Sequence, residues 1–213
     1  MEKNISDLRT DYKKNKLDES ELNPNPLKQL DIWLNEAINA EVQEPTAMAL
    51  ATSTKDGKPS VRIVLLKDIN DEGLTFFSNY DSRKGKELTE NPFASVVILW
   101  RELERQVRVE GEVKKISEEE SNVYFNSRPF LSRISAAVSP QSQPIPDREY
   151  LEKRVAKFKE SVIEYNVPKP ANWGGYRLVP TSIELWQGRE NRLHDRLVYS
   201  KIENNWKITR LAP

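Results

Sequence analysis

The sequence predicts an α+β fold built on an antiparallel β-barrel, and three observations support this class. Short apolar runs bounded by turn residues recur from residue 46 onward and again from residue 175 to the end. Helical patterns are inserted among these runs without the regular strand–helix alternation of a parallel sheet. Several runs are apolar on both faces, as expected of strands that are covered on both sides or closed into a barrel.

The chain begins with a polar segment that has too little apolar surface to pack alone. We therefore predict a flexible N-terminal arm over residues 1–24, ordered only if it docks, and a single domain over residues 25–213. Asn25 and Pro26 then supply an N-cap and a first-turn proline, and apolar residues recur at helical spacing up to Ile38. This pattern predicts an amphipathic helix.

The strand predictions follow the apolar runs and the turn residues between them. Asp56 and Gly57 separate the first two runs, which indicates a β-hairpin. A short helix that begins near Ser82 and stops at Asn91 interrupts the next runs. The predicted strands cover residues 47–54, 61–67, 74–78, 94–100, 105–116, 175–179, 183–187, 192–200 and 206–211.

Two further helices are predicted in the second half of the chain. Ser117 and Glu120 have the spacing of a capping box, which opens a helix that stops at Arg128 and Pro129. Apolar residues at helical spacing predict another helix over residues 147–164. The combination of strands and inserted helices, without a glycine-rich phosphate-binding pattern, disfavours a Rossmann fold.

Composition excludes several classes of function. Lys plus Arg and Asp plus Glu number 33 each, so the chain has no net positive field that would attract nucleic acid. The absence of cysteine and the presence of one histidine exclude thiol nucleophiles, thiolate metal sites and all-imidazole metal sites. Any redox chemistry therefore depends on a bound organic cofactor. No run approaches the ~18 apolar residues that span a bilayer, so we expect a soluble cytoplasmic protein without a membrane partner.

The single histidine, His194, lies between two arginines. If residues 192–200 form a strand, Arg192, His194 and Arg196 share one face, with the arginines about 13 Å apart. Three basic groups on one face repel one another unless an anionic or electron-rich group lies against them. The pattern therefore favours a ligand site. The alternative is ordinary surface pairing with carboxylates, worth about 0 to 1 kcal/mol a pair, which leaves the position of His194 unexplained.

Other clusters repeat this theme of anion-binding side chains in apolar surroundings. Arg62 and Lys67 bracket an apolar run and lie on opposite faces of a regular strand, so they imply two separate anionic groups. Arg83 and Lys84 lie at the start of a helix, where free N–H groups and the positive end of the dipole favour phosphate. A solvated helix start is an equally weighted alternative.

Gln106 and a group of three polar residues after it are further candidates, and each has both a ligand-binding and a structural interpretation. The amide of Gln106 can donate and accept, which suits the edge of a heteroaromatic ring, although a surface role is the commoner one. Tyr124, Arg128 and Ser132 follow at four-residue steps and can together bind a phosphate. Alternatively, Tyr124 belongs to the core and Arg128 pairs with a helix dipole.

Together these segments resemble the pyridoxine 5'-phosphate oxidase family, over a stretch from about Asp11 to the last residue. The resemblance implies an FMN-binding split β-barrel that forms a homodimer with FMN at the subunit interface. It also implies oxidation of pyridoxine 5'-phosphate and pyridoxamine 5'-phosphate to pyridoxal 5'-phosphate, with O2 as final oxidant and H2O2 as product. The segments that carry it are Arg62–Lys67, Ser82–Lys84, Glu104–Val107, Tyr124–Pro129, Gln141–Ser142, Trp173–Gly175, Trp186–Gly188, Arg192–Arg196, Trp206–Ile208 and Arg210–Pro213.

The resemblance also implies roles for single residues. The residues expected to bind FMN are Arg62, Ile63, Val64, Leu65, Leu66, Lys67, Phe77, Ser78, Arg83, Lys84, Gln106, Gln141, Ser142, Trp186 and Arg196. The residues expected to bind the substrate are Arg9, Tyr12, Lys67, Tyr124, Arg128, Ser132, Arg192, Leu193 and His194. Of these, Arg192 and His194 would be the catalytic residues that face the reacting carbon.

The sequence departs from the family pattern at a flavin-side position, and rival functions would require other sets of residues. Phe77 stands where the pattern has tyrosine, so one flavin-side hydroxyl is missing. Another FMN-dependent split-barrel reductase would keep Arg62 and Lys84 but would not need Tyr124 and Arg128. A non-enzymatic flavin or pyridoxal-phosphate carrier would bind cofactor without releasing peroxide.

Overall fold

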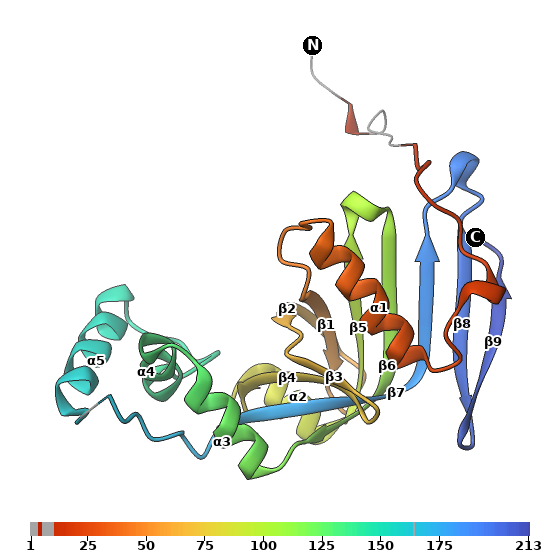
Figure 1. Ribbon diagram of the computed structural model, residues 1–213. Helices are drawn as coiled ribbons and strands as arrows, with labels where there is room; N and C mark the ends of the chain where they lie inside the picture. The colour runs from red at the N-terminus through yellow and green to blue at the C-terminus, as the bar shows by residue number, and fades with distance from the viewer. Residues whose placement is uncertain (1–3, 6–10, 164) are drawn as a thin grey trace.

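A curled antiparallel sheet forms the centre of the computed structural model, which describes residues 4–5, 11–163 and 165–213 (Figure 1). Within these residues nine strands join in the order β2-β1-β5-β6-β7-β4-β3, with β8 added to β7 and β9 to β8. The strands are β1 Ala47–Ser53, β2 Pro59–Leu65, β3 Asp68–Asn70, β4 Gly73–Asn79, β5 Phe93–Trp100, β6 Arg105–Lys115, β7 Trp173–Gln187, β8 Asp195–Ile202 and β9 Asn205–Leu211. The α-helices are α1 Pro26–Asn39, α2 Arg83–Glu90, α3 Glu118–Ser127, α4 Phe130–Val138 and α5 Arg148–Ser161. The predicted α+β class is confirmed.

Strand β7 organises the sheet because it is long enough to pair with three other strands. It pairs with β6 along its length, with β4 over its first half and with β8 over its second half. The register with β6 shifts between Glu110 and Gly111, opposite Pro180. The sequence predicted two strands here, 175–179 and 183–187, because proline normally interrupts a strand; the irregular pairing accommodates Pro180 within one strand.

Helix α1 covers one face of the sheet and closes the main core. The side chain of Asn25 accepts hydrogen bonds from the backbone N–H groups of Leu27 and Lys28, at 2.9 and 3.3 Å, as the N-cap prediction required. Leu30 and Trp33 are buried against the sheet. The apolar stripe of α1 therefore packs as its helical spacing predicted.

Helices α3, α4 and α5 lie to one side of the sheet, where they form a second, smaller core (Figure 1). The predicted capping box of Ser117 and Glu120 opens α3. Helix α4 was not predicted, because it follows Pro129 directly and has no side-chain N-cap bond to signal its start. Trp173, at the beginning of β7, packs into this second core and so links it to the sheet.

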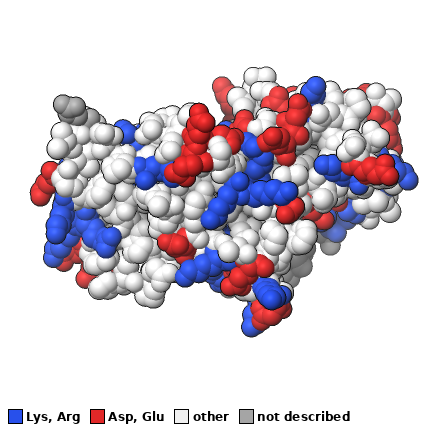
Figure 2. Space-filling model, turned by 90° about the horizontal axis from the view of Figure 1, so that it is seen from below, with Lys and Arg blue, Asp and Glu red and all other residues white. Residues whose placement is uncertain are grey.

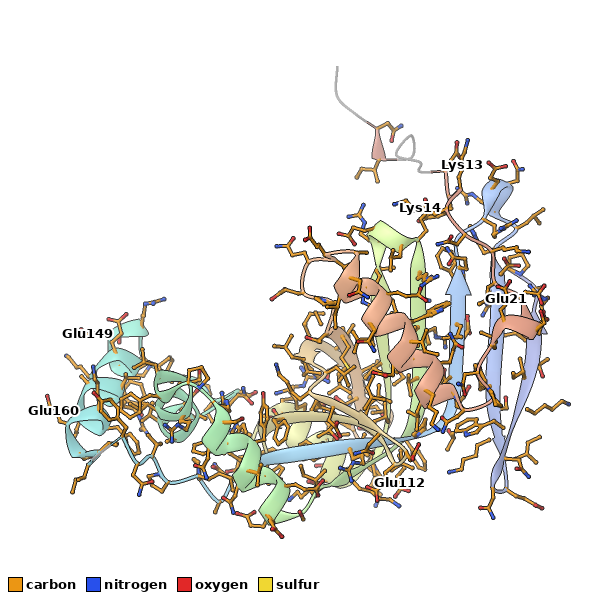
Figure 3. The ribbon with its side chains drawn as sticks, in the orientation of Figure 1. Lys13, Lys14, Glu21, Glu112, Glu149 and Glu160 are labelled. Atoms are coloured by element: carbon orange, nitrogen blue, oxygen red, sulfur yellow. The ribbon has the colours of Figure 1, made fainter. Side chains whose placement is uncertain are left out.

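The described part of the predicted arm, residues 11–24, lies against the sheet. Lys13 and Lys14 belong to this part of the arm (Figure 3). Their backbone N–H groups donate to the buried Glu104 carboxylate, at 2.8 and 3.0 Å. Leu17 is buried, and its N–H donates to Asp195. The division into a flexible arm and one domain stays a prediction.

The start of β8 corrects the sequence-based account of the histidine segment. The strand begins at Asp195, and Arg192 lies in a preceding short 3₁₀ turn, Glu190–Arg192. Asn191 and Arg192 have positive φ angles of 55° and 63°, so the backbone there is left-handed rather than extended. Arg192, His194 and Arg196 consequently do not share a strand face, and that premise was wrong.

Other boundaries differ by smaller amounts. Strand β2 runs two residues earlier than predicted, so Lys67 lies beyond its end. Strand β3 was not predicted, because three residues are too few for a periodic pattern.

On the face drawn in Figure 2, basic and acidic side chains are interspersed. None of the helices in the described part of the chain is long and apolar enough to cross a membrane.

Candidate functional site

A cavity of about 630 Å³ lies where β2 and β4 meet α2, α3 and α4. It collects residues that are far apart in the sequence, because β4 leads directly into α2 and α3 packs against β7 next to β4. The predicted site residues that line it are Arg62, Ile63, Val64, Leu65, Lys67, Phe77, Ser78, Lys84, Tyr124, Arg128, Ser132 and Gln141. The structure therefore brings both Arg62 and Lys67 to one cavity.

At one end of the cavity, Lys84 is a buried cation whose direct partners among the described residues are all neutral. Its Nζ donates to Ser78 Oγ at 3.0 Å, Ser82 Oγ at 3.3 Å and Gln141 Oε1 at 3.2 Å. Burial lowers the pKa of Lys84, and the charge of Arg62 lowers it further. A buried ammonium without a direct carboxylate partner favours an anionic ligand.

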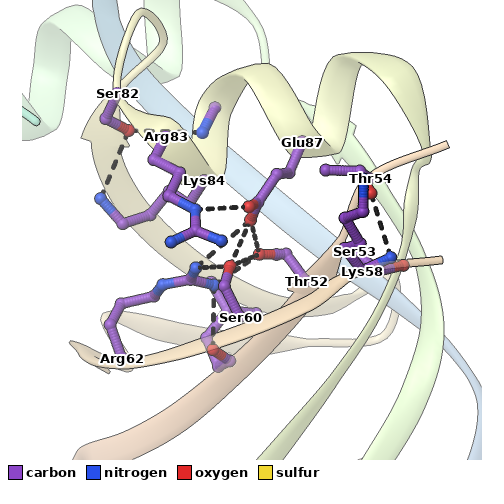
Figure 4. Close-up of polar contacts among 12 residues, drawn as sticks. Thr52, Ser53, Thr54, Lys58, Ser60, Arg62, Ser82, Arg83, Lys84 and Glu87 are labelled. Carbon is purple, nitrogen blue, oxygen red and sulfur yellow. Dashed lines mark hydrogen bonds and ion pairs between the residues drawn. The ribbon is translucent and has the colours of Figure 1, made fainter. Parts of the chain in front are cut away.

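Beside Lys84, a buried carboxylate connects two arginines (Figure 4). Glu87, whose side chain is 4% exposed, lies 3.3 Å from Arg62 Nη2 and 2.8 Å from Arg83 Nε. Hydroxyls of Thr52 and Ser60 also donate to it, each at 2.5 Å. Burial by itself would raise the pKa of Glu87, but these hydrogen bonds and the Arg62 charge outweigh it and lower the pKa to about 2.

At the other end, Arg128 and Tyr124 lie among aromatic rings. The Arg128 guanidinium lies 4.8 Å over the Trp173 ring, and its buried Nη1 has no hydrogen-bond partner in the described part of the chain. Tyr124 stacks on Phe77 with ring centroids 3.8 Å apart. Burial lowers the pKa of Arg128 and raises that of Tyr124. A buried donor without a partner calls for a ligand acceptor.

A second cavity, of about 730 Å³, lies at the far ends of β5, β6 and β7. Gln106 on β6 lies between Leu99 of β5 and Trp186 of β7 in the sheet register, and all three line this cavity. Tyr12 also lines it, and its ring meets the Trp186 ring edge-on at 5.5 Å. Predicted cofactor and substrate residues thus meet again here, apart from the first cavity.

His194 lies next to this second cavity, with its ring 4.7 Å from Trp186 and 5.6 Å from Tyr12. Its Nδ1 accepts a hydrogen bond from the backbone N–H of Arg189 at 3.1 Å. Burial and then the Arg192 charge lower the pKa of His194, against the opposing effect of Asp195. These contacts favour neutral imidazole with its proton on Nε2.

The remaining predicted residues lie outside both cavities. Leu66 is part of the buried core, and Leu193 is 70% exposed. Arg196 forms a bidentate ion pair with Glu184 at 2.9 and 3.0 Å. Ser142 lies in an exposed turn with a φ of 68°, and Arg83 is mostly exposed beside Glu87. Arg192 is exposed in its turn, and Arg9 lies outside the described residues.

Sequence reasoning missed several residues of the first cavity region. Glu87 could have been found from its position four residues after Arg83 on one helix, a spacing that favours an ion pair. Thr52 and Ser60 had no such signal, because their contact with Glu87 depends on the packing of α2 on β1 and β2. Trp173 had been noted only as part of a motif, without a role.

Solved structures define the class of protein to which this fold and cavity belong. PhzG from Burkholderia lata, in complex with tetrahydrophenazine-1-carboxylic acid, superposes with a TM-score of 0.86 at 36% identity, covering 91% of this chain and 95% of that one. A pyridoxamine 5'-phosphate oxidase-related, FMN-binding protein from Nostoc punctiforme shares the fold, with a TM-score of 0.71 at 16% identity, over 90% of this chain and 100% of that one. The chain is a split β-barrel protein.

Sequence comparisons identify the family within this class. Residues 34–161 match the pyridoxamine 5'-phosphate oxidase model, and residues 173–213 match the pyridoxine 5'-phosphate oxidase C-terminal dimerisation region. A pyridoxine/pyridoxamine 5'-phosphate oxidase of Cyanothece sp. is 53% identical over 209 residues, 98% of each chain. The chain belongs to the pyridoxamine 5'-phosphate oxidase family, a family of oxidases, and its cofactor is FMN.

Proposed function

We propose that this protein oxidises pyridoxine 5'-phosphate and pyridoxamine 5'-phosphate to pyridoxal 5'-phosphate, with FMN as hydride acceptor and O2 as final oxidant. The observation that carries this proposal is the presence of two separate sets of cations in the first cavity. Lys84 and Arg62 lie on the β2 and α2 side, whereas Arg128 lies beside Tyr124 over the Trp173 ring. Lys67 lines the same cavity, and we assign it to the second set. Two phosphate esters, one on the cofactor and one on the substrate, require two such sets.

The residues at the α2 end fit the phosphate of FMN. In the described part of the chain, neutral oxygens hold the Lys84 ammonium, and Arg62 and Arg83, joined through Glu87, add guanidinium groups. The start of α2 adds the positive end of a helix dipole. Val64 and Leu65 line the cavity next to Arg62 and supply part of an apolar wall for a flat ring system.

The residues at the α3 and α4 end fit the phosphate of the substrate. Arg128 has a buried Nη1 without a partner, and Lys67 has no ion-pair partner in the part of the chain that the structure describes. The hydroxyls of Tyr124 and Ser132 line the same cavity. A fork-shaped guanidinium and two hydroxyls can together satisfy a phosphate.

We further propose that the active enzyme is a homodimer and that the second cavity of one copy completes the first cavity of its partner. Exposed apolar side chains on β2 and β5, among them Val61 at 69% and Phe93 at 64%, provide a surface for such pairing. The match of residues 173–213 to a dimerisation region supports it. Gln106 and Trp186 would then contact the cofactor, and Arg192 and His194 the substrate.

When bound, FMN supplies the acceptance of a hydride and its delivery to O2. Pyridoxine 5'-phosphate and O2 then give pyridoxal 5'-phosphate and H2O2. Pyridoxamine 5'-phosphate also consumes water and releases ammonia. The protein would hold the two rings in register, and the Nε2–H of His194 and the Arg192 guanidinium would face the reacting carbon.

An oxidase that acts on a phenazine precursor is the second candidate, because of the 36% identity to PhzG. The ligand of that structure carries a carboxylate and no phosphate. Such a ligand would leave part of the positive charge near Arg128 without an anionic partner. We therefore rank this candidate below the first.

Peroxide release distinguishes the two candidates. The purified protein, loaded with FMN, is assayed with pyridoxine 5'-phosphate, pyridoxamine 5'-phosphate and tetrahydrophenazine-1-carboxylic acid. We expect rapid peroxide formation with the phosphorylated substrates and little with the carboxylic acid. Turnover of the carboxylic acid alone would support the second candidate, and FMN binding without any peroxide would support a carrier.

A further inference from the structure

We propose that Glu87 is a positioning residue of the FMN phosphate site, which holds Arg62 and Arg83 side by side and limits the positive charge of the site. This inference rests on the proposed function, since it requires that the α2 end of the cavity binds the cofactor phosphate. Glu87 lies on α2 one turn after Arg83 and is 4% exposed. It is the acidic member of a cluster that is otherwise cationic or neutral (Figure 4).

Both carboxylate oxygens of Glu87 accept hydrogen bonds. Oε2 accepts from Thr52, Ser60 and Arg62, and Oε1 accepts from Arg83. The hydroxyls of Thr52 and Ser60 in turn accept hydrogen bonds from Arg62, so each connects the guanidinium to the carboxylate. The carboxylate is therefore fixed by groups on β1, β2 and α2.

This arrangement leaves the two arginines in different states. Nη1 and Nη2 of Arg62 each donate twice, to Leu50 and Thr52 and to Ser60 and Glu87 respectively. A guanidinium has five N–H donors, so among the residues that the structure describes these four bonds leave the Nε–H of Arg62 for a ligand. Its main contribution is thus a fixed positive charge.

Arg83 is the opposite case. It contacts Glu87 through Nε alone, and its two terminal nitrogens have no partner in the described part of the chain. Its side chain is 64% exposed, so without Glu87 nothing would hold its orientation. Glu87 therefore determines where the free N–H groups of Arg83 lie at the start of α2.

The charge of Glu87 also suits a phosphate monoester. Three cations, Arg62, Arg83 and Lys84, combined with one carboxylate leave a net charge of +2. A phosphate monoester carries about −1.5 to −2 at pH 7. The site is thereby matched to the phosphate, and the mutual repulsion of the three cations is reduced.

Removing the carboxylate charge has two opposite effects, which makes the inference testable. Loss of a negative charge strengthens the Coulomb attraction for phosphate, whereas loss of the Nε contact releases Arg83. We expect the positional effect to be larger, because an exposed arginine without a partner samples many rotamers. The Glu87→Gln variant should accordingly bind FMN roughly tenfold more weakly, the usual scale for losing one charge-assisted hydrogen bond.

The experiment titrates apoprotein with FMN and with riboflavin, which lacks the phosphate, and follows quenching of flavin fluorescence. Wild type should prefer FMN, and Glu87→Gln should lose about tenfold of FMN affinity while riboflavin affinity stays within about twofold. The control is Glu90→Gln, which removes the same charge from an exposed position on the same helix. Both affinities should be unchanged in this control.

Each other outcome overturns the inference. Unchanged or tighter FMN binding by Glu87→Gln would show that charge outweighs positioning, and an equal loss for FMN and riboflavin would show a merely structural role. If the wild-type protein binds riboflavin as tightly as FMN, the cavity has no phosphate site, and the proposed function of this end of the cavity fails together with the inference.

A double-mutant cycle identifies the group through which Glu87 acts. Arg83→Ala alone should weaken FMN binding about tenfold without affecting riboflavin, and this variant tests the inference even if Glu87→Gln fails to fold. In the Arg83→Ala background, Glu87→Gln should change FMN affinity by less than about twofold. A full tenfold loss in that background would contradict positioning of Arg83.

Discussion

At the scale of single residues, two cations of the site, Lys84 and Arg128, have no carboxylate partner in the described part of the chain. Most arginines of this chain form ion pairs, as Arg196 does with Glu184 and Arg177 does with Glu120. Lys84 and Arg128 instead project buried polar nitrogens into one cavity. Because burying an unpaired charge is costly, such residues are retained where a ligand compensates for them.

The first prediction separates cofactor binding from turnover. Lys84→Ala should weaken FMN retention by roughly tenfold or more, because it removes a charged donor to phosphate, while saturating FMN restores most of kcat. Arg192→Ala should do the reverse, with FMN retention preserved and kcat strongly reduced. Flavin content after dialysis and steady-state peroxide release measure the two effects; equal effects of both variants would refute the division of roles.

The second prediction concerns acid stability and the pKa of Glu87, which is lowered to about 2. A lowered folded-state pKa stabilises the protein above the unfolded-state value of 4.5, and this contribution is lost as the pH falls from 4.5 toward 2. It amounts to roughly 3 kcal/mol. The free energy of unfolding should therefore fall less steeply with decreasing pH in Glu87→Gln than in wild type. Urea denaturation at pH 6 and pH 3 measures this free energy for both proteins. An equal decrease between the two pH values in wild type and variant would contradict the prediction.

The sequence identified the cations of the site but not how they are arranged. Arg62, Lys67 and Arg128 were predicted from residue type and spacing, and the structure places all three at one cavity. The prediction that Arg192 and His194 share a strand face was wrong. It assumed the alternation of side chains in a regular strand, which cannot reveal the left-handed turn at Arg192. The contacts of a buried carboxylate such as Glu87 depend on tertiary packing, which a local pattern does not contain.

At the scale of elements, the irregular pairing of β6 with β7 shapes the sheet around the site. A Cβ at Gly111 would lie 2.0 Å from the carbonyl oxygen of Val179, so glycine is required for the two backbones to approach. Beyond the irregularity, β7 continues to pair with β6 while its first half also pairs with β4. The curvature thus separates the first cavity, near β4, from the second, near Gln106 and Trp186.

The third prediction is that Gly111→Ala destabilises the protein by about 3 kcal/mol, because the neighbouring backbone cannot yield as a flexible side chain would. Glu112→Ala, at the next position of β6, should cost less than about 1 kcal/mol, since it removes only a partly exposed ion pair with Lys114. Urea denaturation gives both values. Similar costs for the two substitutions would contradict the close approach.

Elements with local signals were predictable, and the others were not. Helices α1 and α3 have N-caps that the sequence displays, at Asn25 and Ser117, and both were confirmed. Helix α4 lacks a cap, and β3 has only three residues, so neither offers a local signal. The single strand β7 was divided in the prediction because its proline is tolerated only through the tertiary pairing with β6.

At the scale of the whole molecule, most of the predicted site residues lie in two cavities of one chain. The first contains Arg62, Lys84 and Arg128, and the second contains Gln106, Trp186 and Tyr12. Exposed apolar side chains on β2 and β5 accompany them. A second copy of the chain, packed on these strands, is the simplest way to unite the two cavities.

The fourth prediction tests the pairing surface. Val61→Asp should shift the protein toward monomer and reduce activity, because it introduces a charge into the proposed apolar interface. Val123→Asp is the matched control, since Val123 on α3 is also 69% exposed. Sedimentation and peroxide assays compare them. A dimeric and active Val61→Asp protein would exclude this surface from the interface.

Subunit complementation tests most directly the claim that each site combines the first cavity of one copy with the second cavity of its partner. Arg128→Ala and Arg192→Ala, each nearly inactive alone, are mixed under conditions that allow subunit exchange. If the claim holds, one site of each mixed dimer carries both substitutions and the other carries none, so the mixture should recover activity, with each mixed dimer about half as active as wild type. If mixed dimers form and show no recovery, both residues act within one chain, and the claim is wrong.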